Sequence, residues 1–176
     1  MKIQTKRLTL RPAALADAAR ISLLAGDFDV ACMTGTIPHP YSEQMAAEWL
    51  AGALQGEEGV VFMIERSDTL IGCTGYRAFG HDHGELGYWI GKPYWGQGYA
   101  TEAVRALITH AFDADGFDYL MAGHFTDNPA SERVIRKLGF VAQGDEVRDC
   151  VARGTATYCV TYRLDRAQAM AEFHKA

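Results

Sequence analysis

One segment constrains this chain more than any other, because an apolar strand pattern runs through a glycine-rich turn directly into a helix pattern. The stretch from Glu85 to Arg105 is ELGYWIGKPYWGQGYATEAVR. Gly96 and Gly98 lack a Cβ, so a bulky anion can approach the backbone N–H groups of the turn. The N-terminus of the following helix adds unpaired N–H groups and about half a positive charge. The segment therefore predicts a pyrophosphate site that requires no basic side chain.

Two glycines in a loop are a weak signal alone, because many loops use them only to bend tightly. We expect the helix over Gly98 to Phe112. The amides expected to face the anion are those of Gln97, Gly98, Tyr99, Ala100 and Thr101. A second organised segment, NPASERVIRKLGF, runs from Asn128 to Phe140. Its first residue can cap a helix, and its proline stands where a helix needs no N–H donor.

Together these two segments resemble the motifs of the GNAT superfamily of acyl-CoA N-acyltransferases, most closely its RimJ/RimL-like branch. The opening TKRLTLRP (5–12), the piece IPHPYS (37–42) and the helix containing Trp49 are also similar to that branch. The resemblance covers nearly the whole chain. It implies a mixed α/β (α+β) GNAT fold, in which a central, mostly antiparallel twisted sheet splays at the acetyl-CoA groove and is flanked by helices. It also implies acetyl-CoA as cosubstrate.

Composition limits the partners and the surroundings. Acidic residues outnumber basic ones by 22 to 17, giving a net charge of −5, which argues against a surface that follows nucleic-acid phosphates. The four cysteines form no Cys-x-x-Cys pair, so we expect reduced thiols. No stretch predicts a membrane span or a signal peptide, and a cytoplasmic location is expected. The 176 residues suit a single N-acetyltransferase domain over 1–176.

Periodicity and turn residues predict the remaining elements. Strands are expected at Ile3–Arg11, Val60–Glu65, Leu70–Arg77, Gly84–Ile90, Tyr119–Phe125, Phe140–Ala142 and Ala156–Leu164. Further helices are expected at Ala13–Leu24, from the N-cap Ser42 to about Leu54, and at Asp165–Lys175. The irregular segment Gly26–Tyr41, with a short helical piece, and the polar connection Gly144–Gly154 are expected to carry acceptor specificity.

The resemblance also implies where the cofactor arm lies. The pantetheine would pair with the open edge of Gly84–Gly91, beside Tyr119–Phe125, and a backbone N–H at Trp89 or Ile90 would polarise the thioester carbonyl. Without the resemblance, the same strand would be a buried strand whose aromatic residues serve only packing. Trp95 stands where much of the superfamily has Gln or Arg. This departure removes a side-chain phosphate contact and leaves the backbone site.

Glu85 is the candidate general base, because several members of the superfamily place a catalytic glutamate at the head of this strand. The alternative is a solvated glutamate, with the amine proton passing through water. An α-amine, with a reference pKa of about 8, needs a weaker base than a lysine amine of about 10.4. Asp27 and Asp29, together with Glu85, could attract a cationic amine.

The resemblance places Ser131 where RimJ/RimL-like enzymes steady the departing thiolate. Asn128 would bind the pantetheine arm or cap the helix, and helix capping is the alternative for both residues. Other members of the superfamily use a tyrosine acid at the position of Ile135. His81, His83 and His124 could assist, although each is more typical of a surface or packed histidine, and the HDH run cannot turn all three side chains toward one metal ion.

Three function classes stay open at this point. The first is an N-acetyltransferase that transfers the acetyl group of acetyl-CoA directly to a primary amine, with a protein or peptide α-amine as the leading acceptor. The second is a non-catalytic module that binds or senses acyl-CoA. The third is a structural partner subunit. The expected partners are the amine substrate, either a protein N-terminus or a small molecule, and a second copy of the chain in a homodimer. Nucleic acid, membrane and metal are not expected.

Overall fold

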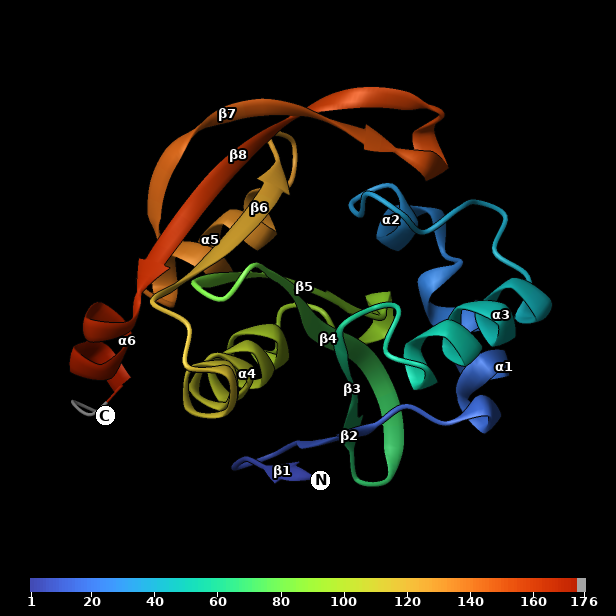
Figure 1. Ribbon diagram of the computed structural model, residues 1–176. Helices are drawn as coiled ribbons and strands as arrows, with labels where there is room; N and C mark the ends of the chain where they lie inside the picture. Colours follow the sequence, from blue (N-terminus) through green and yellow to red (C-terminus); the bar gives the residue numbers. More distant parts are fainter. Residues whose placement is uncertain (174–176) are drawn as a thin grey trace.

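A computed structural model describes residues 1–173 as one twisted eight-stranded sheet with helices on both faces (Figure 1). The strands are β1 (Ile3–Gln4), β2 (Thr9–Pro12), β3 (Val60–Arg66), β4 (Thr69–Phe79), β5 (His83–Ile90), β6 (Tyr119–Phe125), β7 (Val141–Cys150) and β8 (Thr155–Asp165), in the spatial order β1-β2-β3-β4-β5-β6-β8-β7. Every neighbouring pair is antiparallel except β5 with β6. The predicted mixed α/β fold with a mostly antiparallel sheet is confirmed.

The helices frame this sheet. They are α1 (Ala18–Ala25), α2 (Phe28–Ala31), α3 (Glu43–Leu54), α4 (Tyr99–Asp115), α5 (Pro129–Lys137) and α6 (Arg166–Phe173), with 3-10 turns η1 (Leu15–Asp17), η2 (Lys92–Tyr94) and η3 (Val151–Arg153). Among the helices of residues 1–173, none combines the length and apolar character needed to cross a lipid bilayer.

The sheet splits between β5 and β6. These strands pair in parallel only over His83–Tyr119, Gly84–Leu120 and Glu85–Met121. Beyond those pairs β5 stays on β4 while β6 stays on β8, and the two ribbons diverge (Figure 1). We call this divergence the splay, the β1–β5 side the first arm and the β6–β8–β7 side the second arm. The splay expected from the resemblance is therefore present.

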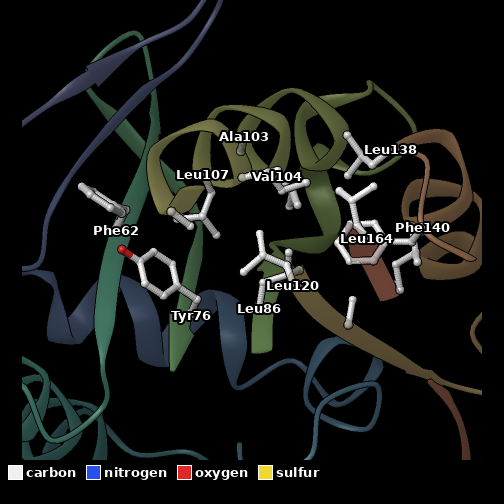
Figure 2. Close-up of a cluster of buried hydrophobic side chains, with 14 of the residues drawn as sticks. Phe62, Tyr76, Leu86, Ala103, Val104, Leu107, Leu120, Leu138, Phe140 and Leu164 are labelled. Atoms are coloured by element: carbon white, nitrogen blue, oxygen red, sulfur yellow. The ribbon is translucent and has the colours of Figure 1, made fainter. Parts of the chain in front are cut away.

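Two hydrophobic clusters sit on opposite faces of the sheet. On one face α4 and α5 cover Leu86, Leu120 and Leu164 (Figure 2). On the other face α1 and α3 contribute Ile21 and Leu50 to a second cluster. Successive side chains of a strand point to opposite faces, so β5 presents alternate residues to each cluster. This alternation decides which face of the splay each candidate residue occupies.

The extent of β7 corrects the prediction for the segment after α5. We expected a short strand at Phe140–Ala142 and a polar connection over Gly144–Gly154, whereas β7 pairs with β8 along Val141–Cys150. It is the edge strand and is largely exposed, so it lacks the apolar alternation that identifies a half-buried strand. A register shift between Ala142 and Gly144 further interrupts the pattern. Backbone pairing, which composition does not reveal, holds this strand.

The N-terminal strand is also divided, which corrects the continuous strand expected at Ile3–Arg11. A turn separates β1 from β2, with the Thr5 N–H donating to Leu8 O at 2.9 Å. Glu102 of α4 holds this turn, because its carboxylate accepts from the Thr5 hydroxyl and from the Arg7 N–H, each at 2.7 Å. A partner nearly a hundred residues away cannot be seen in local alternation.

Most other predicted elements agree with the structure. Ser42 caps α3 by accepting from the Met45 N–H at 3.1 Å, and α2 is the short helical piece expected after Gly26. The predicted helix over 13–24 begins instead as the 3-10 turn η1 and continues as α1. The C-terminal helix is present as α6, and the end of its predicted range, 174–175, lies outside the described residues.

Candidate functional site

The glycine turn, Trp95–Gly98, has the conformation that its glycines permit. Gly96 and Gly98 have φ angles of +72° and +78°, in the left-handed region that residues with a Cβ rarely adopt. Gly98 is the N-cap of α4, a helix of 17 residues. The turn thus delivers the backbone directly into the helix start, as the sequence predicted.

Several backbone donors gather at this helix start. The first α4 amide with a backbone acceptor is that of Glu102, which donates to Gly98 O at 3.1 Å. Within residues 1–173, no backbone acceptor pairs with the N–H groups of residues 97–101. These are the five amides that the sequence analysis selected. Unpaired donors at the N-terminus of a long helix form a site for an anion.

Arg7 is a functional candidate that sequence reasoning missed. Its guanidinium donates to Gln97 O at 2.9 Å and to the Glu102 carboxylate at 2.7 Å, and it lies 4.7 Å from the Tyr99 ring centroid. The side chain is 42% exposed. It therefore fixes the glycine turn through a carbonyl and adds positive charge beside the amides. The sequence predicted a site that requires no basic side chain, and the fold of the N-terminal strands brings this one beside it.

Trp95 links the glycine turn to the end of β5. Its indole N–H donates to Ile90 O at 2.6 Å, while the side chain is 45% exposed. Trp95, which stands where much of the GNAT superfamily has Gln or Arg, thus bonds the protein backbone.

The open edge of β5 has a defined set of backbone groups. Ile90 O accepts from Trp95, whereas Trp89 O points toward β4 and lies 2.4 Å from where a Cβ on Gly72 would stand. Because the N–H and C=O of one strand residue point to the same side and alternate along the strand, the amides of Tyr88 and Ile90 face the splay. Of the two donors considered from sequence, this geometry favours Ile90 over Trp89.

Glu85 lies at the apex of the splay, at the last β5–β6 pair. Its carboxylate bonds the guanidinium of Arg148 on β7, which also bonds Glu146. Burial opposes the charge of Arg148, but these two hydrogen bonds outweigh burial and raise the pKa of Arg148 above its usual value. Glu85 keeps 28% of its side chain exposed. Arg148 was missed because its segment was expected to be a loop.

The β5 face that carries Glu85 is open at Gly87, the next residue on the same face. Gly87 lies between Glu85 and Trp89 on this face, and a Cβ added there would meet nothing within 4 Å. Trp89 packs against the α1–α3 cluster. The strand is therefore exposed at Gly87 on this face.

The acidic residues of α2 are held separately from Glu85. Asp29 pairs with Lys92 of η2, and Asp27 caps α2 by accepting from the Asp29 N–H at 2.9 Å. Each of the three carboxylates expected to attract a cation thus already has a hydrogen-bond partner within the protein, and two of these partners are cationic. The net attraction for an amine is weaker than the sequence count suggests.

The two arms meet again beyond the splay. The Val151 N–H of η3 donates to Gly35 O at 3.0 Å, and Arg153 donates to Cys32 O at 2.7 Å. Arg153 also binds both oxygens of Asp127, at 2.8 and 3.1 Å. Figure 1 shows the β7–β8 hairpin reaching toward α2. This contact bridges the arms on the side where Glu85 and Gly87 face.

Asn128 and Ser131 have different roles at the start of α5. Asn128 is the N-cap, and its side-chain oxygen accepts from the Ser131 N–H at 3.1 Å. The Ser131 hydroxyl instead lies 2.7 Å from the Tyr88 hydroxyl on β5. Burial raises the pKa of Tyr88 to about 12, against a smaller lowering by Ser131. Ile135 is 1% exposed, in the core.

The histidines lie away from these groups. His124 is buried between Phe125 O, at 2.7 Å, and the Tyr162 hydroxyl, at 3.1 Å. His83 stacks on Tyr119 at 4.7 Å between centroids, at the closed end of the splay, and His81 is exposed on the same hairpin. In the described part of the chain, no group of three or more His, Cys, Asp or Glu side chains is arranged to hold a metal ion.

Two open depressions lie on the surface. One of about 310 Å³ is lined by α1 and η2, including Arg20, Asp27 and Lys92, just before the glycine turn. A slightly larger one of about 340 Å³ lies at the far end of α4, lined by Tyr76, Asp115 and neighbouring residues. Neither is lined by Glu85 or Ser131, so these depressions do not locate the site.

Comparisons with known proteins show the family and the fold. Residues 7–141 match the family model described as an acetyltransferase (GNAT) domain. The uncharacterized N-acetyltransferase YoaA of Bacillus subtilis (strain 168) is 33% identical over 148 residues, covering 81% of this chain and 84% of that protein. The ribosomal-protein-serine acetyltransferase of Escherichia coli (strain K12) is 31% identical over 86 residues, 48% of each. The structure of RimL, a ribosomal L7/L12 α-N-protein acetyltransferase in complex with coenzyme A, has a TM-score of 0.81 at 19% identity, covering 94% of this chain and 98% of that one, and shows the shared fold.

Proposed function

The chain belongs to the GNAT acetyltransferase family and is an N-acetyltransferase, and on that premise we propose that it transfers the acetyl group of acetyl-CoA directly to the α-amine of a protein or peptide. The observation that carries this proposal is that two sets of backbone groups without partners in the protein lie next to each other. The amides of residues 97–101 and the free edge of β5 are joined through the glycine turn.

The two surfaces fit the two halves of coenzyme A. A diphosphate suits the amide cluster and the helix N-terminus, with Arg7 adding charge nearby. A pantetheine arm carries amides that can pair with the β5 edge as an added strand would. The Ile90 or Tyr88 N–H can then donate to the thioester oxygen as negative charge develops on it.

Glu85 suits the role of base toward the acceptor amine. In the reaction the amine nitrogen bonds the carbonyl carbon, the C–S bond breaks, and the amine loses one proton to Glu85 or to water. Because Arg148 pairs with the Glu85 carboxylate, protonation of Glu85 weakens this ion pair. Such a base suits an α-amine, about one-tenth neutral at pH 7, better than a lysine amine.

The relatives support the acceptor class. Proteins described as ribosomal-protein acetyltransferases occur among both the sequence relatives and the solved structures. Their acceptors are proteins, so we take a protein α-amine as the acceptor here. The N-acetyltransferase relatives also favour an enzyme over a module that only binds acyl-CoA.

A thiol-release assay tests the proposal. Purified protein and acetyl-CoA are offered peptides with a free α-amine, the same peptides blocked at the N-terminus but carrying lysine, and free amino acids and polyamines. We expect thiol release with free α-amine peptides only, and an acetyl group at the N-terminus by mass spectrometry. Calorimetry with acetyl-CoA runs in parallel. Binding without thiol release from any amine would contradict the enzymatic proposal, and release only with small amines would contradict the acceptor class.

A further inference from the structure

Tyr88 connects the first arm of the splay to α5, at the residue proposed to contact the leaving thiolate. It lies on β5, and its ring packs on the α4–α5 face, where Leu86 and Ile90 are buried. Its hydroxyl lies 2.7 Å from Ser131 Oγ in the first turn of α5. The sequence assigned Tyr88 no role in the site. The structure instead gives it a polar contact with the residue proposed to steady the thiolate.

The direction of this hydrogen bond follows from chemistry. A phenol, with a reference pKa of about 10, is a stronger donor than an aliphatic alcohol, so the short contact is best made by the Tyr88 O–H to Ser131 Oγ. The other acceptor within reach, Ser131 O at 3.4 Å, is at the limit of a hydrogen bond. The Ser131 N–H is already used by Asn128. With the Tyr88 O–H as donor, Ser131 Oγ accepts this bond, and its single proton is free to point elsewhere.

We propose that Tyr88 is a positioning residue for departure of the thiolate, because its hydroxyl donates to Ser131 Oγ and leaves the Ser131 proton directed at the sulfur. This inference rests on the proposed function and on the role of Ser131 in it. When the C–S bond breaks, the electron pair stays on sulfur, Ser131 donates a hydrogen bond to it, and the thiolate takes its proton from solvent. Tyr88 gains and loses no proton.

Two further features agree with this assignment. A donor that itself receives a hydrogen bond is polarised and donates more strongly, so Tyr88 makes Ser131 a better partner for a thiolate. The burial that raises the pKa of Tyr88 to about 12 also keeps the phenol protonated, and so able to donate, across neutral and mildly alkaline pH. With Ile135 at the position where other family members have a tyrosine acid, Tyr88 reaches α5 from the opposite arm.

The first test is a double-mutant cycle in single-turnover acetyl transfer. Tyr88→Phe removes only the hydroxyl and should lower the rate about fivefold, the loss of one neutral hydrogen bond, with acetyl-CoA affinity unchanged. Ser131→Ala should lower it about tenfold or more, because it removes a bond to a charged group. The double variant should match Ser131→Ala alone. Additive losses, or a loss in Tyr88→Phe with none in Ser131→Ala, would overturn the proposal.

A matched control separates positioning from packing. Tyr162→Phe also removes a buried phenol hydroxyl, which contacts His124 and Arg136 and not Ser131, and should lower thermal stability as Tyr88→Phe does without changing the rate. An equal rate loss in both variants would assign the effect to stability.

The second test does not depend on turnover. Coenzyme A bound to the protein is titrated, and its thiolate is followed by ultraviolet absorbance. We expect a thiol pKa below that of free coenzyme A in the wild type, and about fivefold weaker thiolate stabilisation in Tyr88→Phe. If no amine is ever acetylated but this shift is seen, the proposed function fails and the Tyr88 contact stands. An unshifted thiol in wild type, or an identical shift in Tyr88→Phe, overturns the inference on Tyr88.

Discussion

The two sides of the splay are built from different materials. The side proposed to bind the cofactor presents backbone groups, the amides of residues 97–101 and the free edge of β5. The side proposed to receive the acceptor presents ion pairs between residues far apart in the sequence, Glu85 with Arg148, Asp29 with Lys92 and Arg153 with Asp127.

This difference predicts which side of the splay tolerates substitution. Backbone donors survive almost any side-chain substitution, so a cofactor common to a family can be bound while the rest of the sequence changes. Ion pairs are remade by single substitutions, so the acceptor side can change its charge pattern without disturbing the cofactor side. We therefore expect changes at Glu85 to affect transfer alone, and changes at the glycine turn to affect cofactor affinity.

The largest effect is expected for Glu85→Gln. This change keeps the shape and removes the proton acceptor, so kcat should fall by about 10² to 10⁴ while acetyl-CoA affinity stays the same. Steady-state kinetics and calorimetry measure the two quantities. Glu146→Gln is the control, because it also removes a carboxylate from Arg148 but lies on β7 and not on β5. A similar fall in both variants would show that the state of Arg148, and not a base at Glu85, controls the rate.

A smaller loss, of about 100-fold in coenzyme A affinity, is expected for Gly98→Pro. Proline fixes φ near −65°, which is incompatible with the +78° of Gly98, and it removes one amide donor. Gly154→Pro is the matched control, since Gly154 has a φ of +64° in the β7–β8 hairpin. Both variants should lose stability, and only Gly98→Pro should lose affinity in calorimetry. Full affinity in a folded Gly98→Pro protein would remove the basis for the backbone site.

The same division explains what the sequence could predict. The glycine turn, α4, β6 and the Asn128 cap follow from local chemistry, because each depends on residues a few positions apart. The residues that were missed act across long separations. Arg148 reaches Glu85 over 63 residues, Tyr88 reaches Ser131 over 43, and Arg7 reaches Gln97 over 90. Periodicity has no access to such pairs, and β7, which supplies Arg148, is exposed and polar.

The smallest effect is expected for Glu102→Gln, which tests whether the backbone amides at the start of α4 need support from side chains. Glu102 ties the N-terminal turn to the start of α4 through Thr5 and Arg7. Burial alone would raise the pKa of Glu102, but the hydrogen bonds from Thr5 and Arg7 outweigh it and lower the pKa. A carboxyl whose pKa is lower in the folded protein stabilises the fold above its unfolded pKa, about 4.3, and this contribution is lost as pH falls through the folded value.

Glu102→Gln should therefore be less stable than wild type at pH 7, by about 1 to 2 kcal/mol, and the gap should close as the pH falls below about 4. Urea unfolding between pH 3 and 7 measures this difference. Coenzyme A affinity should fall only a few-fold, because the amides remain when Arg7 loses its partner. Glu132→Gln, which breaks an exposed pair with Arg136 on α5, is the control and should change stability little. If affinity falls as far in Glu102→Gln as in Gly98→Pro, binding at the amides of residues 97–101 depends on side chains too. The contrast between the two sides of the splay then does not hold.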